Sequence, residues 1–235
     1  MITLNDYLYS GDTVLRILKK YIADLRISAV QKHNEVDLVH CNFLIQIMKL
    51  LEHNDFLTSQ SQKIREFYKY MAQEYPYLSF TFKGRIKSLI RAEGKFNGYI
   101  VEYIYDYYEK NGSYPSVSEI KERLNCFRDL IAYRIVISMP RCHMKQKQDR
   151  KKEEIRYLYR IANVLPQFLE ERGFTAEPTG GVKRSNSLLL DDAVRPYYRD
   201  YIDGESTNSY RSLHITFFDN SARCYMEMQL RTKEM

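Results

Sequence analysis

The amino-acid sequence predicts an α+β protein in which a mixed β-sheet is flanked by helices and preceded by an N-terminal helical region. Three observations support this fold class. Apolar residues repeat at helical spacing through residues 1–76, residues 129–139 are almost continuously apolar and β-rich, and residues 210–232 hold two alternating strands around a short turn. We therefore divide the chain into a helical region, 1–76, and an α+β domain, 77–235.

Three helices are expected in the N-terminal region. The first follows a capping sequence at 11–13 and carries an apolar repeat at helical spacing, formed by Val14, Leu15, Leu18, Tyr21, Ile22 and Leu25. The second, 36–53, is apolar nearly all round, and the third covers 59–71. Pro76 ends the helical pattern.

Strand patterns follow in four segments of the remaining chain: the start of 78–90, then 129–139, 210–218 and 222–232. The unbroken apolar run of 129–139 is typical of a central strand. Asp-Asn-Ser at 219–221 favours a hairpin between the last two strands.

Helix and loop signals lie between these strands. Ser116 and Glu119 have the spacing of a capping box, which predicts a helix reaching Leu124. A helical apolar repeat over 155–169, with a kink expected at Pro166, ends before Gly173. Residues 178–196 are expected to form a mobile loop, because they contain paired glycines and a Ser-Asn-Ser run.

Composition places few limits on function. The net charge of +6 fits a nucleotide or RNA ligand, although many proteins that bind neither have the same surplus. No apolar run approaches the length of about 20 residues that a membrane span needs. The N-terminus has no signal-peptide pattern, and four scattered cysteines fit reduced thiols. We expect a cytoplasmic protein without membrane attachment.

Two acids occupy positions where an apolar residue would fold better. Asp129 opens the most hydrophobic strand, and Glu227 lies on the polar side of an alternating strand, in register with Gln229 and Arg231. If the strands are neighbours, two carboxylates at about 4–6 Å repel unless a cation such as Mg²⁺ lies between them. Spacing alone favours ordinary ion pairs instead, between Asp129 and Arg128 or Arg134, and between Glu227 and Arg231.

Basic and aromatic residues add further candidates. Arg85 and Lys87 share one side of an extended segment and Lys95 follows, a pattern that suits a triphosphate, although surface charge explains it equally well. Tyr210 and His214 lie on one side of a strand, where the ring of Tyr210 is placed either to stack on a base or to pack at an edge.

Taken in order, these segments resemble the synthetase domain of the RelA/SpoT family. The stretches that carry the resemblance are "GRIKS", "RDLIAYRIVIS", "YRDYIDGESTNSYRSLHITF" and "YMEMQLRT". They are similar to the family patterns R-x-K; D-hydrophobic-x-[GA]-x-R-[IV]-[IV]; K-D-Y-[IV] with P-K-x-N-G-Y-x-S-L-H; and E-x-Q-[IL]-R-T. The similarity covers about residues 80–232, and the last two motifs in tandem are the most specific.

The resemblance implies a nucleotidyltransferase-like fold and an ATP-dependent pyrophosphokinase. Such an enzyme transfers the β,γ-pyrophosphate of ATP to the ribose 3′-OH of GDP or GTP and makes alarmones of the (p)ppGpp type. By resemblance, the roles fall into three groups: Arg85, Lys87 and Lys95 bind ATP; Asp129 and Glu227 bind Mg²⁺, with Glu227 also a candidate to take the 3′-OH proton; and Arg199, Tyr210, His214, Gln229 and Arg231 line the acceptor side. Tyr210 would stack on the guanine.

The sequence departs from the family pattern at the acceptor loop. Glu205 and Ser206 replace the proline and lysine of P-K-x-N-G-Y, so a cation expected to hold the acceptor's 5′-phosphates is missing. Arg91-Ala92 replaces the usual Ser-Ile, and the spacer 96–126 is longer than usual. The metal motifs of the long enzymes' hydrolase region are not evident in residues 1–76. The sequence fits either a small stand-alone synthetase or a shortened chain.

Two alternatives stay open at this point. Toxic small synthetases of toxin–antitoxin systems include members that pyrophosphorylate the 3′-OH of the tRNA CCA end, an acceptor that does not need the missing lysine. A basic surface at 19–20 or 145–152 would then bind the tRNA backbone, and an antitoxin protein would be a further partner. The second alternative is an inactive RNA-binding regulatory module. A homo-oligomer is compatible with each of these.

Overall fold

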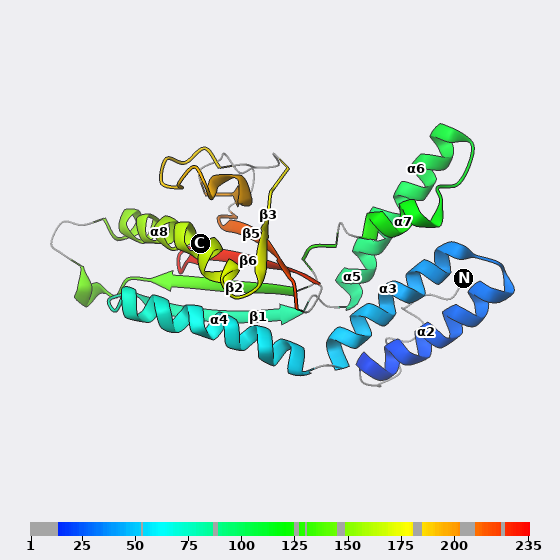
Figure 1. Cartoon of the computed structure of the whole chain (residues 1–235), viewed down its shortest axis with the longest axis horizontal. Helices are drawn as coiled ribbons and strands as arrows, with labels where there is room; N and C mark the ends of the chain where they lie inside the picture. The colour runs from blue at the N-terminus through cyan, green and yellow to red at the C-terminus, as the bar shows by residue number, and fades with distance from the viewer. Residues whose placement is uncertain are drawn as a thin grey trace. The chain divides into compact units, whose positions relative to one another are not determined.

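A six-stranded β-sheet is the central element of the computed structural model. The structure describes residues 14–52, 54–86, 89–124, 127–129, 131–144, 149–180, 185–202, 210–221 and 224–235. They form two compact units, the first drawn from 1–58 and 88–127 and the second from 59–87 and 128–235. The first unit is helical, and the second contains the sheet (Figure 1).

The sheet has the strand order β1-β2-β6-β5-β3, and β4 also pairs with β5. The pairing of β2 with β6 is parallel, and the other pairings are antiparallel, so the sheet is mixed as predicted. Its strands are β1 (Ser79–Ile86), β2 (Ile131–Ser138), β3 (Phe174–Glu177), β4 (Tyr198–Asp200), β5 (Leu213–Asp219) and β6 (Cys224–Thr232).

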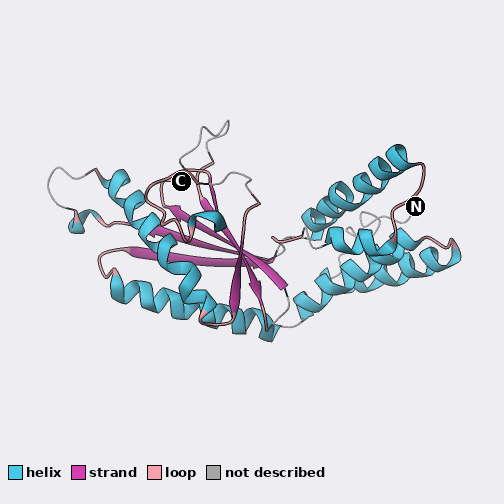
Figure 2. Cartoon of the chain, turned by 45° about the horizontal axis from the view of Figure 1, so that its top comes forward, coloured by secondary structure: helices cyan, strands magenta, loops and turns pink. Residues whose placement is uncertain are grey.

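One face of the sheet is apolar and is covered by two helices (Figure 2). Alternate residues of β2, β5 and β6, such as Ile135, Ile215 and Met228, are completely buried there. Helix α8 (Arg150–Glu170) packs on β2, β3 and β6. In α4 (Asn54–Glu74), the ring of Tyr68 lies 6.0 Å from the rings of both Phe80 and Phe82 on β1.

The opposite face, which we call the polar face, carries charged and hydrogen-bonding side chains. Residues paired across neighbouring strands lie on the same face of a sheet. The register therefore aligns one polar row across five strands, formed by Lys83, Arg134, Gln229, His214 and Arg199. A second row contains Arg85, Ala132, Glu227 and Thr216.

Gly84 on β1 pairs with Tyr133 on β2, and the contact leaves no room for a side chain. A Cβ at residue 84 would lie 2.7 Å from Cε1 of Tyr133, whose side chain is almost completely buried. We expect Gly84→Val to lower the free energy of unfolding by about 1–3 kcal/mol, because the ring or the strand must shift. Urea denaturation measures this change. Gly94→Ala is the control, because a Cβ there meets no atom within 4 Å and alanine favours the helix. Equal stability of the Gly84→Val and Gly94→Ala variants would contradict the expectation.

The first unit is built from helices: α2 (Val14–Gln31), α3 (Glu35–Glu52), α5 (Leu89–Phe96), the π-helical η1 (Asn97–Val101), α6 (Glu102–Asn111) and α7 (Val117–Leu124). Asn34 caps α3, since its Oδ1 accepts hydrogen bonds from the backbone N–H groups of Val36 and Asp37. Aromatic rings fill the core, and Phe43 lies 5.3 Å from Phe96 and 4.6 Å from Phe127 between ring centroids.

A buried polar cluster joins three helices of this unit. Glu93 on α5 accepts a hydrogen bond from the hydroxyl of Tyr21 on α2 at 3.3 Å and lies 2.8 Å from Nε2 of His40 on α3. Burial, together with the nearby Glu93 carboxylate, raises the pKa of Tyr21. The cluster therefore connects α5 to α2 and α3 through Glu93, which lies two residues before Lys95.

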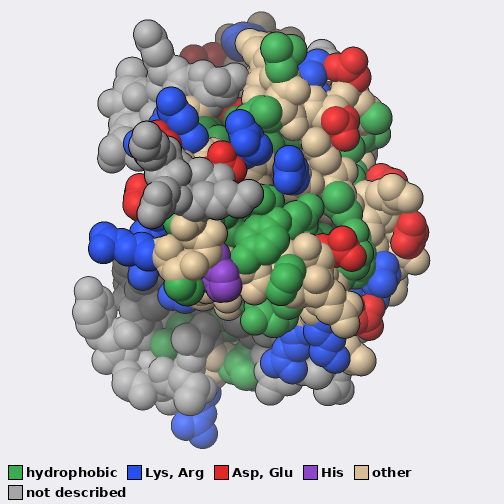
Figure 3. All heavy atoms as spheres, turned by 90° about the vertical axis from the view of Figure 1, so that its left-hand side faces the viewer, with side chains coloured by type: hydrophobic (Ala, Val, Ile, Leu, Met, Phe, Trp, Pro, Cys, Tyr) green, Lys and Arg blue, Asp and Glu red, His purple; other side chains and the backbone are tan. Residues whose placement is uncertain are grey.

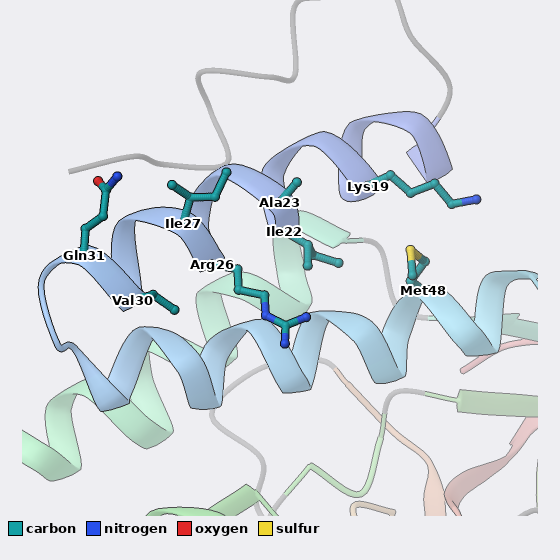
Figure 4. A pocket seen from close by; sticks show the side chains of 8 residues that line it. All are labelled: Lys19, Ile22, Ala23, Arg26, Ile27, Val30, Gln31 and Met48. Atoms are coloured by element: carbon teal, nitrogen blue, oxygen red, sulfur yellow. The ribbon is translucent and has the colours of Figure 1, made fainter.

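A groove of ≈ 720 Å³ runs along α2 beside Met48 of α3. Figure 4 shows that isoleucine, valine and alanine side chains of α2 line it, together with Lys19 and Arg26. Ile27 and Val30 are each 58% exposed here. One of the two basic segments considered for tRNA binding therefore borders an apolar surface.

Several sequence predictions are confirmed, and others need correction. The capping box is present, because Glu119 Oε2 accepts from the Ser116 N–H at 2.7 Å and Ser116 Oγ accepts from the Glu119 N–H at 3.3 Å. The hairpin between β5 and β6 is also present. The long spacer contains η1, α6 and α7 and belongs, together with α5, to the same compact unit as α2 and α3. Each compact unit is therefore formed from two separate stretches of the chain rather than meeting the other at residue 76. Among the described residues, no helix is long and apolar enough to cross a membrane.

Candidate active site

Glu227 is at the centre of a hydrogen-bonded network on the polar face. Its carboxylate is reached from three strands, because Arg199 lies on β4, His214 on β5 and Gln229 on β6 itself. Oε1 accepts from Nη2 of Arg199 at 2.8 Å and lies 3.1 Å from Nδ1 of His214. Oε2 accepts from Nε2 of Gln229 at 2.8 Å. The residue is only 8% exposed, so the network excludes most water from the carboxylate.

The network keeps Glu227 ionised. Burial by itself raises the pKa of this carboxyl group, but hydrogen bonds and charge from His214, a hydrogen bond from Gln229 and the charge of Arg199 outweigh burial and lower the pKa to about 2. A carboxylate with such a low pKa is a weak proton acceptor at neutral pH. It is better suited to hold a cation or to orient the imidazole.

His214 links Glu227 to Tyr210. The hydroxyl of Tyr210 lies 2.8 Å from Nε2 of His214, while Nδ1 faces Glu227. Since an ionised carboxylate can only accept, Nδ1 carries the proton in the neutral imidazole, and Nε2 accepts from Tyr210. The ring of Tyr201 lies 4.9 Å from that of His214 and holds its orientation. A carboxylate thus fixes the tautomer of a histidine whose second nitrogen accepts a hydrogen bond from Tyr210.

Arg231 lies beside the ring of Tyr210, for which the resemblance implies stacking on the guanine. Its guanidinium is 4.8 Å from the ring centroid of Tyr210, and its Nε donates to the backbone carbonyl of Arg211 at 3.1 Å. Nη2 donates to the carbonyl of Met235. Arg231 therefore lies against the Tyr210 ring, whose other ring neighbours are Tyr201 and His214, at 5.9 and 5.8 Å between centroids.

Gln229 connects Glu227 to Arg134, a residue for which the spacing suggested only an ion pair. Nε and Nη2 of Arg134 both donate to Oε1 of Gln229 at 3.3 Å. The two residues are 95 positions apart and meet because β2 and β6 pair in parallel. No local pattern predicts this contact, although both residues lie in the quoted motifs.

The remaining predicted residues are placed as follows. Asp129 is half-buried, two residues before β2, and the polar contacts of Glu227 within the described part of the chain do not include it. Arg85 lies on β1 in register with Ala132, which in turn pairs with Glu227. Lys95 belongs to the helical unit, where its Nζ lies 5.4 Å from the centroid of the Tyr99 ring. Lys87 lies outside the described residues, as does the acceptor loop 203–209.

One of the ion pairs suggested by spacing is wrong. Glu227 pairs with Arg199 and not with Arg231. Arg128 lies 3.7 Å from Glu177 of β3 and over the ring of Tyr225, and Arg134 binds Gln229. The correct partner of Glu227 is on β4, a three-residue strand that the sequence analysis did not predict.

The fit of Mg²⁺ to this site depends on a phosphorylated substrate. The described residues contain no group of three or more His, Cys, Asp or Glu side chains that could hold a metal ion. Oε1 of Glu227 already accepts from two donors, whereas Oε2 accepts from one and has a lone pair left. Proteins commonly bind Mg²⁺ through one or two carboxylates plus substrate phosphates. Glu227 fits as one such ligand.

Comparison with known proteins gives no family assignment. No family model matches the chain, and no curated protein is significantly similar to it.

Proposed function

We propose that the polar face binds ATP and transfers its β,γ-pyrophosphate to the ribose 3′-OH of GDP or GTP in the cytoplasm. One observation carries this proposal: side chains from three separate motifs form a single connected network around a buried carboxylate. These side chains are Arg134, Arg199, Tyr210, His214, Glu227 and Gln229. Their types match the resemblance to RelA/SpoT synthetases.

The network supplies a base for the acceptor hydroxyl. A ribose 3′-OH that takes the place of the Tyr210 hydroxyl at Nε2 of His214 gives its proton to that nitrogen. Glu227 stabilises the imidazolium that forms, because its carboxylate faces Nδ1 at 3.1 Å. The 3′ oxygen attacks the β-phosphorus, the bond to the α,β-bridging oxygen breaks, and AMP leaves. This assigns the proton to His214 rather than to Glu227, whose pKa of about 2 is far below neutral pH.

Basic side chains provide for the phosphoryl charge. The ion pair with Glu227 fixes the position of the Arg199 guanidinium. From that position its positive charge would stabilise the phosphoryl oxygens. Mg²⁺, when bound with the nucleotide, would neutralise charge on the phosphoryl oxygens. By resemblance, Asp129 remains a proposed ligand for that ion, and Arg85, Lys87 and Lys95 remain proposed ATP contacts.

The function is tested by incubating the protein with ATP labelled at the γ-phosphate and Mg²⁺, in parallel with GDP, GTP and deacylated tRNA. We expect label in the guanine nucleotides, as a product with two added phosphates, and none without Mg²⁺. Label in tRNA alone would overturn the proposed acceptor. No label in any acceptor, together with no Mg²⁺-dependent ATP binding by calorimetry, would favour an inactive RNA-binding module.

The tRNA CCA end is the second candidate acceptor, because Ser206 and Glu205 remove a cation that GDP phosphates would need. A long anionic backbone is usually bound by a continuous basic surface. On the face shown in Figure 3, the Lys and Arg side chains of the described residues stand in separate groups between acidic and apolar ones. We place the guanine nucleotide first, because more members of the family that the sequence resembles use that acceptor.

A further inference from the structure

A cationic pocket lies on the polar face, toward the start of β1. Its volume is ≈ 400 Å³. It is lined by residues of β1 and β2 and by one lysine after β6: Ser79, Thr81, Lys83, Arg134, Val136, Ser138 and Lys233. Three of these side chains are cationic, three carry hydroxyl groups, and no carboxylate is among them. A pocket with this lining favours an anion.

The register explains why these side chains gather. Ser79 pairs with Ser138, and Lys83 pairs directly with Arg134, so both pairs lie on one face of the antiparallel ladder. Like charges directly opposite each other destabilise such a ladder. Within the described part of the chain, no carboxylate forms an ion pair with Lys83 or Lys233. The positive charge of the pocket is therefore left for a ligand to neutralise.

We propose that this pocket binds an oligophosphate group and is distinct from the Glu227 centre. Ammonium, guanidinium and hydroxyl donors are the groups that bind phosphate oxygens in proteins. Val136, which lines the pocket, is four residues along β2 from Ala132, the residue that pairs with Glu227. At the rise of a strand, this separation is about 13 Å.

Arg134 connects the pocket to the Glu227 centre. It lines the pocket, and it donates two hydrogen bonds of 3.3 Å to Gln229, which in turn donates to Glu227. Bonds of this length to a neutral amide are weaker than a charge-assisted bond to phosphate. An oligophosphate in the pocket draws Arg134 away from Gln229 and loosens one of the three bonds that hold Glu227. Binding at the pocket thus regulates the centre, a consequence that rests on the proposed function, whereas binding itself does not.

The binding test uses inorganic tripolyphosphate and the full chain without Mg²⁺, measured by calorimetry. We expect the double variant Lys83→Ala/Lys233→Ala to weaken tripolyphosphate binding at least tenfold. The single variant Lys83→Arg, which keeps the positive charge and the wild-type Lys233, should bind as the wild type does. The control is Lys69→Ala, an exposed lysine on α4, which should bind as the wild type does. If the double variant fails to fold, Lys233→Glu is tested instead. This variant should fold, because Lys233 is exposed and follows β6. Unchanged binding by Lys233→Glu and by a folded double variant would overturn the site.

The regulatory part is read in the labelling assay. Tripolyphosphate is expected to change the transfer rate of the wild type at least threefold and to leave the rate of Lys83→Ala/Lys233→Ala unchanged. An equal response of both proteins would overturn the coupling while leaving the transferase intact. If no transfer occurs in any protein, the proposed function fails, and the binding experiment still decides whether the pocket is an anion site.

Discussion

Replacing Glu227 with glutamine is expected to lower pyrophosphate transfer by about 10³-fold or more, with the fold retained. Glutamine has nearly the same shape, but it removes the negative charge that Arg199 and His214 contact at 2.8 and 3.1 Å. The His214 tautomer is then no longer fixed, and no charge stabilises the imidazolium. The rate is measured by label transfer to GDP or GTP, and the fold by circular dichroism.

The same substitution changes the pH dependence of stability in a defined direction. The pKa of Glu227 is lowered in the folded protein to about 2 from an ordinary value of 4.5. Its contribution to the free energy of unfolding, of order 3 kcal/mol, is therefore complete above about pH 4.5 and is lost as the pH falls toward 2. The wild type should lose stability over this interval, and Glu227→Gln should lose less.

The control for both measurements is Glu170→Gln, a change of an exposed carboxylate at the end of α8. It should transfer pyrophosphate at the wild-type rate and unfold with the wild-type pH dependence. Asp129→Ala is also expected to abolish transfer, because the resemblance assigns Asp129 to the Mg²⁺ site. Transfer by Glu227→Gln within tenfold of the wild type would remove this residue from the mechanism.

Asp200→Ala is expected to have the largest effect on stability, a loss of about 3 kcal/mol or more in the free energy of unfolding. Asp200 is 6% exposed and accepts from the hydroxyl of Tyr159 at 2.8 Å, from Oγ of Ser185 at 2.6 Å and from the backbone N–H of Ile202 at 2.8 Å. Alanine leaves these donors buried without their acceptor. Thermal and urea unfolding measure the loss.

The effect should reach the active site, because Asp200 is the neighbour of Arg199 on β4. Without the anchoring bonds to α8 and to the segment before β4, Arg199 loses its fixed position opposite Glu227. Asp192→Ala is the matched control, since Asp192 is 92% exposed in its side chain and pairs only at the surface with Arg195; a change within about 0.5 kcal/mol is expected. Comparable stability of the Asp200 and Asp192 variants would refute the anchoring role.

The sequence predicts the long elements of this fold because their patterns repeat over many residues. The alternation of β6 and the helical repeat of α8 are two examples, and α8 continues through Pro166. Short edge strands give no such signal. β3 has four residues and β4 has three, too few for a pattern to stand out from a loop. Both were therefore missed.

The candidate site was predictable in its residue types but not in its contacts. The alternating pattern of β6 predicts that Glu227, Gln229 and Arg231 are neighbours on one face. The contacts with Arg134 and Arg199 depend on which strands pair, and pairing is set by packing of the whole sheet. The parallel neighbour of β6 cannot be read from either strand alone, so Arg134 was assigned no role beyond an ion pair.

The parallel pairing of β2 with β6 also has a consequence for biosynthesis. β2 leaves the ribosome long before β6, and residues 95 positions apart must meet before the central ladder can close. Until β6 has been synthesised, Arg134 cannot contact Gln229, and β5 lacks its pairing with β6. A nascent chain that ends before β6 therefore lacks the assembled centre around Glu227.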